Sequence, residues 1–247
     1  MKLSFHCMEC ATETPKPSVN FAVIDIRNDG LYEFTCPKGH KSVTILQEQK
    51  FEILFEIGAH AILDGYYREA VSSFATSLER FRAFYAKVIC LSRGIEDEQI
   101  EIAWKQVSQQ SERQLGTFLC SYLIETGCPP TLLSNKWRRF RNNVIHKGLI
   151  PEKKEAVEYG QQVLDLILPV LYELKDNHTE VLFKTVAQYL TRIIARAPKE
   201  TKKITMSRST IVSISEAKSR AKKLEDELGR LAFERDLFFQ WDSKGNG

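Results

Sequence analysis

The stretch YYREAVSSFATSLERFRAFYAKVICLSRG, from Tyr66 to Gly94, decides the fold class of this chain of 247 residues. Its apolar residues recur at three- and four-residue spacing, which predicts a long amphipathic helix that ends near Gly94. The segment directly before it, FEILFEIGAHAILDG, repeats this spacing and ends at Gly65. Two neighbouring helices of this kind indicate a mainly α fold.

Further helical segments follow and complete a predicted bundle of about five helices over residues 47–196. Pro169 lies inside one of these segments and predicts a kink or an early break there. The segments are residues 96–127, which give one or two helices, then 138–148, 152–175 and 179–196.

The last part of the chain, residues 197–247, is predicted as a separate region. It begins with a polar, basic stretch up to residue 212, which predicts a linker. Ser213 and Glu216 then fit a capping box, which predicts a charged terminal helix from there to about Trp241.

Composition excludes several classes of protein. The chain is 43% hydrophobic and 27% charged, which is typical of a globular protein rather than a disordered one. No apolar run is long enough to span a bilayer, and the first residues lack the apolar region of a signal peptide. Six cysteines in a chain of this length do not indicate a disulfide scaffold. We therefore expect a cytoplasmic protein with no membrane contact.

Residues 1–46 form a predicted small β module with a metal site. Two strand-like runs, at 21–26 and 31–34, are separated by Asn28-Asp29-Gly30, a hairpin turn signal. Two close ligand pairs accompany them and can surround one tetrahedral ion. The pairs are Cys7 with Cys10, and Cys36 with His40.

This arrangement resembles a zinc ribbon, with His40 in place of the fourth cysteine. Four protein ligands leave no open coordination position, so the predicted zinc is structural and no catalytic metal is expected. A module this small has little core, and metal binding would supply free energy of folding. Two alternatives stay open: His6 is a rival ligand, and the cysteines could be free thiols without a metal.

The second candidate site lies in RRFRNNVIHKG, from Arg138 to Gly148. Asn142 and His146 are four positions apart and share a helix face, and the long side chain of Arg141 reaches the same face. Around them the stretch from residue 136 to 147 holds five basic residues and no acidic one, which predicts a polyanion as partner. Besides Arg141, the basic residues are Lys136, Arg138, Arg139 and Lys147.

RNA cleavage suits these residue types. Histidine titrates in the range needed to move a proton, arginine offers a fork of donors to phosphate, and Asn142 can orient the histidine or bind substrate. One imidazole does not easily serve as both acid and base, so a second copy from a dimer partner would help. The competing interpretation is that Arg141 and His146 are ordinary surface or core residues of a helix.

The wider pattern RNNVIHKGLIP…EAVEYGQQVLDL, with the upstream DGYYREAVSSFATSLERF, resembles the HEPN family (higher eukaryotes and prokaryotes nucleotide-binding domain). The family signature is an arginine, a polar residue after it, and a histidine four to six positions beyond the arginine. Here Arg141, Asn142 and His146 fill those places. The resemblance covers roughly residues 50 to 175.

The resemblance implies a dimeric HEPN-like helical bundle in which two arginine–histidine motifs face each other. It implies a metal-independent endoribonuclease of a toxin, abortive-infection or antiphage system, with RNA as substrate and a phage or regulatory protein as a possible trigger. The alternative is a noncatalytic nucleic-acid-binding or adaptor member of the family. The resemblance also makes the helix of Arg68, Glu69, Glu79 and Arg80 a neighbour of the motif, and leaves open which of the four lines the cleft.

Overall fold

The structure of the chain is a computed structural model that describes residues 1–13, 21–199, 201–217 and 222–245. Descriptions of side chains also leave out residues 2, 4, 6, 8, 11, 13, 21, 22 and 237–245. The chain divides into two compact units. The helical unit comprises Gln49–Lys184 and Ser209–Glu234, and the β unit comprises Met1–Glu48, Thr185–Arg208 and Arg235–Gly247. The fold is mainly helical, as predicted, with a small three-stranded sheet formed largely near the N-terminus.

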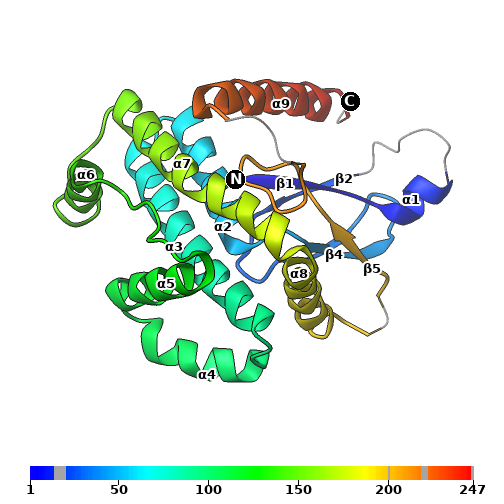
Figure 1. The fold of residues 1–247 in the computed structure, drawn as a ribbon. Helices are drawn as coiled ribbons and strands as arrows, with labels where there is room; N and C mark the ends of the chain where they lie inside the picture. The colour runs from blue at the N-terminus through cyan, green and yellow to red at the C-terminus, as the bar shows by residue number, and fades with distance from the viewer. Residues whose placement is uncertain (14–20, 200, 218–221, 246–247) are drawn as a thin grey trace. The chain divides into compact units, whose positions relative to one another are not determined.

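The helical unit is organised around α3 (Tyr67–Ser92), the helix predicted from the opening stretch (Figure 1). It packs against α2, α5, α6 and α7, and more loosely against α4. The segment predicted as one or two helices forms two, α4 and α5. The bounds are α2 Lys50–Leu63, α4 Asp97–Val107, α5 Ser111–Thr126, α6 Asn135–His146 and α7 Lys153–Asn177.

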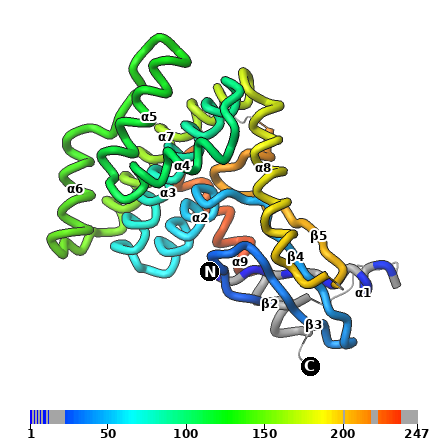
Figure 2. The backbone as a smooth tube through the Cα atoms, turned by 90° about the horizontal axis from the view of Figure 1, so that it is seen from below, coloured from blue at the N-terminus to red at the C-terminus, as the bar shows by residue number. Residues whose placement is uncertain are grey.

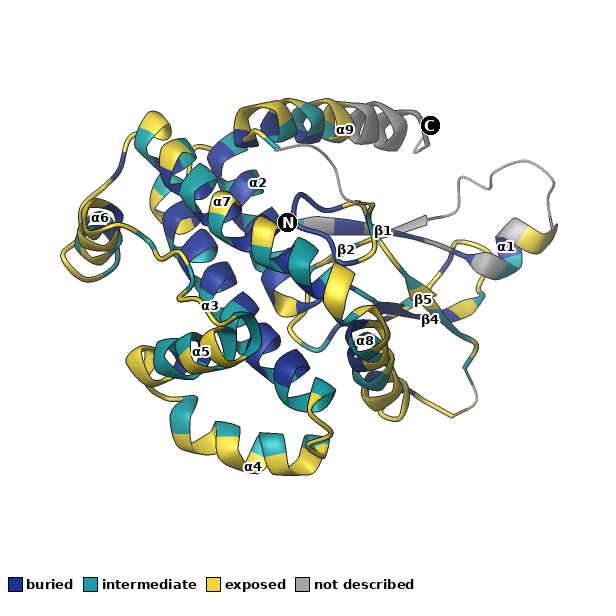
Figure 3. Cartoon of the chain, in the orientation of Figure 1, coloured by how far each residue is buried: buried dark blue, intermediate teal, exposed yellow. Residues whose placement is uncertain are grey.

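Close packing between α2, α3 and α7 depends on two glycines. A Cβ atom on Gly58 of α2 would lie 2.7 Å from the ring of Phe74. A Cβ atom on Gly160 of α7 would lie 2.7 Å from the same ring and 2.5 Å from Leu224. Because any side chain here would collide with buried neighbours, these glycines let three helices meet over one phenylalanine. Figure 3 shows the inward faces of α3 and α7 as buried along their length.

Helix ends follow the predicted glycines, but Pro169 does not act as predicted. The early break was wrong, since α7 continues through Pro169 to Asn177. The reason is packing: α7 buries Leu164 and Ile167 before the proline and Leu171 and Leu174 after it. Tertiary contacts on both sides outweigh the loss of one backbone hydrogen bond.

The β unit holds two sheets rather than the predicted hairpin. Strand β1 (Lys2–His6) pairs antiparallel with β2 (Phe21–Asp25), and β3 (Leu31–Thr35) pairs antiparallel with β4 (Lys41–Leu46). A short helix, α1 (Met8–Glu13), follows β1. The predicted strands thus exist, but β2 and β3 belong to different sheets.

The turn between β2 and β3 redirects the chain instead of pairing the strands. The Asp29 carboxylate accepts a hydrogen bond from the amide of Leu31 at 3.2 Å. It also forms an ion pair with the guanidinium of Arg27 at 2.9 Å. The hydroxyl of the buried Tyr32 accepts a hydrogen bond from the amide of Arg27 at 3.0 Å. Backbone donors at this turn are therefore satisfied by side chains, which removes the need for a ladder between the two strands.

The linker predicted for residues 197–212 was wrong in its central part. Strand β5 (Lys203–Met206) pairs parallel with β4, with Val43 opposite Lys203. Helix α8 (Thr179–Ile194), predicted for 179–196, runs into the β unit. Its C-terminal half packs on the sheet in an apolar cluster that contains Val43, Ile45, Ile193 and Ala197. A four-residue strand is too short to produce a readable alternation of side chains.

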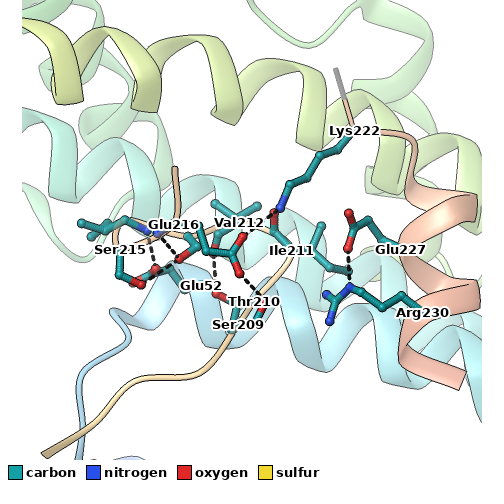
Figure 4. A network of polar contacts seen from close by, with 12 residues as sticks. Glu52, Ser209, Thr210, Ile211, Val212, Ser215, Glu216, Lys222, Glu227 and Arg230 are labelled. Atoms are coloured by element: carbon teal, nitrogen blue, oxygen red, sulfur yellow. Dashed lines mark hydrogen bonds and ion pairs between the residues drawn. The ribbon is translucent and has the colours of Figure 1, made fainter. Parts of the chain in front are cut away.

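The terminal helix begins later than the capping box predicted. Helix α9 (Leu224–Gly245) starts eight residues after Glu216, and residues 209–217 form no helix. The amide of Glu216 does bond to Ser213 Oγ at 3.2 Å, but the Glu216 carboxylate pairs with Lys222 instead of reaching back (Figure 4). The Ser-x-x-Glu spacing was therefore satisfied by a turn.

The segment from Thr210 to Ile214 is held against α2 by buried carboxylates. Glu52 Oε1 accepts the amide of Ile214 at 2.8 Å, and Glu56 Oε2 accepts the amide of Ile211 at 3.2 Å. Lys222 Nζ donates to the carbonyl of Ile211 at 3.0 Å from the other side (Figure 4). Side chains thus take the place of secondary structure for the amides of Ile211 and Ile214 and the carbonyl of Ile211.

The path of the backbone can be followed in Figure 2, from the first strand in blue to α9 in red. Within the described residues, none of the helices combines the length and the apolar character that crossing a bilayer requires.

Candidate metal centre and candidate nucleic-acid interface

The four residues predicted as metal ligands come together in the β unit. Their ligand atoms all lie within 4.8 Å of one another, and the three cysteines are buried. Cys10 Sγ lies 3.6 Å from Cys36 Sγ and 3.4 Å from His40 Nδ1. Cys7 Sγ lies 3.7 Å from the same nitrogen. The arrangement joins the start of α1 to the turn between β3 and β4.

These distances fit a structural metal site. A tetrahedral ion bound at zinc-like bond lengths holds sulfur and nitrogen ligands about 3.5–3.8 Å apart. The three closest contacts given above, at 3.4, 3.6 and 3.7 Å, lie near that spacing, and all four ligand atoms stay within 4.8 Å of one another. Three buried sulfurs and one imidazole are a soft donor set, which suits a metal better than it suits a dry apolar core.

The local backbone shapes the second ligand pair. The amide of Cys36 donates to the carbonyl of His40 at 3.0 Å, and the amide of Gly39 donates back to the carbonyl of Cys36 at 2.8 Å. Gly39 has a φ of +87°, which other residues rarely adopt, so the tight turn between Cys36 and His40 requires glycine here. His40 Nε2 lies 3.9 Å from Glu9, a carboxylate placed to orient the ring while Nδ1 faces the sulfurs.

The electrostatics of the cluster favour a thiolate. Burial raises the pKa of Cys7, but the hydrogen bond from the amide of Cys10 and further hydrogen bonds with His40, Cys10 and Cys36 bring this pKa down to about 6. Thiolate is the form that binds metals. The rival ligand His6 has a side chain outside the described residues.

The second candidate site is carried by α6, which is anchored by one apolar face. Trp137 and Val144 are buried, and the ring of Phe140 lies 5.8 Å from that of Tyr159 on α7. Lys136 Nζ lies 4.5 Å above the ring of Trp137. The remaining face of α6 and its C-terminal cap is exposed and carries the predicted residues Lys136, Arg138, Arg139, Asn142, His146 and Lys147.

Arg141 is held in place by a partner that the sequence left undecided. Its guanidinium lies 2.7 Å from Glu79 of α3 and 3.0 Å from the side-chain oxygen of Asn142. Of the four charged residues of α3 that the sequence left as candidates, Glu79 is the one that forms an ion pair with Arg141 of the motif. The sequence signal was the resemblance, which pointed to the right helix without separating Glu79 from Glu69.

Arg141, Asn142 and Arg138 line a cavity of about 270 Å³. Its walls include Glu79 and Arg82 from α3, Glu112 from α5 and Tyr159 from α7. His146 does not line this cavity: its imidazole is exposed, and no hydrogen bond or ion pair joins it to another described residue. The structure thus brings Arg141 and Asn142 together and leaves His146 at the surface, one helical turn beyond Asn142.

The cavity alters the ionisation of two groups that face it. Burial lowers the pKa of Arg82 to about 10, opposed by the charge of Glu79 and assisted by that of Arg141. Burial also raises the pKa of Tyr159, against the effect of Arg141 and Arg82. At neutral pH Arg82 is therefore charged and the Tyr159 phenol is protonated.

Comparison with known proteins gives no further assignment. No protein-family model matches the chain, and neither the curated proteins nor the solved structures contain a match.

Proposed function

We propose that the protein is a metal-independent endoribonuclease of the HEPN type, acting as a homodimer, with Arg141, Asn142 and His146 in the active site. The observation that carries the proposal is the exposed face of α6. It presents Asn142, His146 and four further cations to solvent and leaves Arg141 partly exposed, while Trp137 and Val144 hold the opposite face in the bundle. A rigid, basic surface of this kind suits a phosphate backbone.

The proposed reaction needs no metal. One imidazole takes the proton of a ribose 2′-hydroxyl, and the resulting oxygen attacks the adjacent phosphorus. Arg141 stabilises the charge that builds on the phosphoryl oxygens. A second imidazole donates a proton to the departing 5′-oxygen, which leaves a 2′,3′-cyclic phosphate on one product and a 5′-hydroxyl on the other.

The exposure of His146 supports the dimer in this proposal. An imidazole with no partner among the described residues of its own chain is accessible to a second copy. Two copies of the motif would supply one acid and one base. Asn142 bonds to Arg141 and lies one turn before His146, where it can bind the substrate or orient the ring.

We propose zinc as the ion of the four-ligand centre, in a purely structural role. Three cysteines and one histidine are a common zinc ligand set, and they leave no position for a reactive water. A reducing compartment, the cytoplasm, keeps such thiols available. A defence or toxin role, with a phage or regulatory protein as trigger, completes the proposal.

Cleavage of a labelled RNA in the presence of chelator tests the proposal. The wild type should produce 2′,3′-cyclic phosphate ends, and a substrate with 2′-deoxyribose at the scissile position should resist. Arg141→Ala and His146→Ala should each abolish cleavage. Arg68→Ala, which removes an exposed arginine from α3, is the matched control and should cleave normally.

Mixed dimers separate a composite site from a monomeric one. Mixing Arg141→Ala chains with wild type should lower activity more than dilution alone. Equal cutting of DNA and RNA, or full activity of His146→Ala, would refute the mechanism.

The noncatalytic alternative has one observation in its favour. Glu79 neutralises Arg141 at 2.7 Å, which weakens its attraction for phosphate. RNA binding without any cleavage, lost in Arg138→Ala and Arg139→Ala, would support this alternative.

A further inference from the structure

The cavity behind Arg141 holds donors that the protein itself does not use. Tyr159, which lines the cavity, is 1% exposed, and no hydrogen bond joins its hydroxyl to another described residue. The guanidinium of Arg82 has no carboxylate within ion-pair distance among the described residues, and it lies over the ring of Phe118 at 5.6 Å. Among the described residues the protein supplies no acceptor for these two donors, which leaves them available to a ligand in the cavity.

The charge of the cavity matches an anion. Three arginines and two glutamates line it, which leaves an excess of one positive charge. Glu79 is already paired with Arg141, and Glu112 is exposed at the rim, where it bonds to Ser111 at 3.3 Å. Two lining cations, Arg82 and Arg138, have no carboxylate within ion-pair distance among the described residues, and Arg82 is the less exposed of the two.

The remaining wall is apolar. Leu78, Leu115, Leu132 and Leu133 line the cavity together with Ala75. Such walls favour a ligand that has an uncharged body as well as an anionic head. A volume of about 270 Å³ admits a small organic molecule but not a polymer chain.

We propose that this cavity binds a small organic oxyanion, a phosphate monoester or a carboxylate with a compact apolar body. The anionic head accepts hydrogen bonds from Arg82 and from the Tyr159 hydroxyl, and the body packs against the leucines. Arg141 and Asn142 line the same cavity, so a bound ligand lies directly behind the face that we assign to RNA. Arg82 and Tyr159, which hold the anionic head, do not belong to the exposed surface of α6, although Arg138, Arg141 and Asn142 belong to both that face and the cavity lining.

Calorimetric titration tests the proposal with three probes: inorganic phosphate, phenyl phosphate and benzoate. The protein is the full chain with His146→Ala, which is inactive under the proposed function, so binding is measured without turnover. Phenyl phosphate should bind at least about tenfold more tightly than inorganic phosphate, because its ring buries apolar surface on the leucines. The affinity for benzoate compared with that for phenyl phosphate shows whether the site prefers a carboxylate or a phosphate head.

Two variants and one control decide where the probe binds. Tyr159→Phe keeps the packing and removes only the hydroxyl, so the tighter probe should bind about tenfold more weakly. Arg82→Gln should weaken it further. Arg68→Gln, on the same helix but exposed, should bind like the parent. If Arg82→Gln fails to fold, Tyr159→Phe alone still decides.

Failure to bind any of the three probes at millimolar concentration would overturn the proposal. So would binding that Tyr159→Phe and Arg82→Gln leave unchanged, since the anion would then lie elsewhere. Neither result bears on cleavage, which is measured separately with the wild type. A protein that cleaves RNA but binds no probe, or one that binds probes but cleaves nothing, separates the two proposals.

Discussion

Arg141 of α6 and Glu79 of α3 are 62 positions apart in sequence, and their charged groups lie 2.7 Å from each other. About a quarter of each side chain is exposed, at 25% and 26%. A pair that is partly hydrated contributes little to stability, because solvent screens the attraction. Its main effect is on geometry: it fixes the direction of the guanidinium relative to the central helix of the bundle.

Loss of Glu79 should therefore affect activity more than stability. Glu79→Gln should change the free energy of unfolding by less than about 1 kcal/mol while lowering RNA cleavage about tenfold or more, since Arg141 loses its fixed orientation. Urea denaturation and initial cleavage rates measure the two effects. Glu69→Gln, on the same helix with a more exposed carboxylate, serves as control. Unchanged cleavage by Glu79→Gln would show that the pair plays no part in catalysis.

The metal centre predicts a stoichiometry. Elemental analysis of the purified protein should find about one zinc per chain, by the four-ligand rule for structural sites. Cys36→Ser should lose most of the metal and loosen the β unit, whereas Cys120→Ser, which removes an exposed thiol, should keep both. Amide exchange over residues 31–46 reports on the fold of this unit. Metal-free protein with full protection there would rule out a structural ion.

Glu52 should be among the most sensitive acidic positions of the helical unit. Its carboxylate accepts the amide of Gln49 at 2.7 Å and that of Ile214 at 2.8 Å, and it is 3% exposed. Glu52→Ala leaves both buried donors unpaired and should cost roughly 2–5 kcal/mol of unfolding free energy.

Glu52→Gln retains one acceptor oxygen and should cost less than Glu52→Ala. Glu158→Ala, an exposed acid on α7, should be nearly neutral. Equal stability of Glu52→Ala and wild type in urea would mean that the segment after residue 209 is not held by this carboxylate.

Glu125 predicts a dependence of stability on pH. Burial raises the pKa of Glu125, but the hydrogen bonds with Arg93 at 2.7 Å and His178 at 2.9 Å outweigh burial. The net result is a pKa below the ordinary value of 4.5. A carboxyl whose pKa falls on folding adds stability above its unfolded pKa, and this is lost as the pH falls through the folded pKa. Glu125→Gln should therefore be less stable than wild type near neutral pH, by roughly 1–3 kcal/mol.

The difference between wild type and Glu125→Gln should shrink as the pH falls below about 4.5, because the wild-type carboxyl then becomes neutral as well. Urea midpoints at about pH 7 and about pH 3.5 measure it. Arg113→Gln, an exposed arginine elsewhere on α5, controls for general charge effects. A difference that stays constant with pH would exclude Glu125 as the titrating group.

Long, periodic elements could be predicted from the sequence because many residues report the same structure. The helix from Tyr67 to Ser92 spans 26 residues, so its apolar face repeats several times. The ligand pairs at Cys7 and Cys36 were predictable for a different reason, since metal chemistry restricts both residue type and spacing. The HEPN assignment and the catalytic role of His146 stay predictions.

The parts that could not be predicted depend on contacts between distant residues. Strand β5 has four residues and joins a partner far away in sequence, so neither its length nor its neighbours indicate it. The spacing of Ser213 and Glu216 is compatible both with the start of a helix and with the turn that forms. Glu79 and Glu69 look alike on a charged helix, and only the position of α6 distinguishes them.

The parallel pairing of β4 with β5 has a consequence for the order of events during synthesis. Gln47 bonds to Thr205 across 158 positions, so the sheet gains its third strand only after the helical unit up to Lys184 has been made. Domains generally fold in the order in which they leave the ribosome. The three-stranded sheet, although β3 and β4 are made before the helical unit, should therefore be among the last parts of the chain to become complete. Until then the ribosome-bound chain has an open strand edge at β4 that a chaperone or a neighbouring nascent chain can reach.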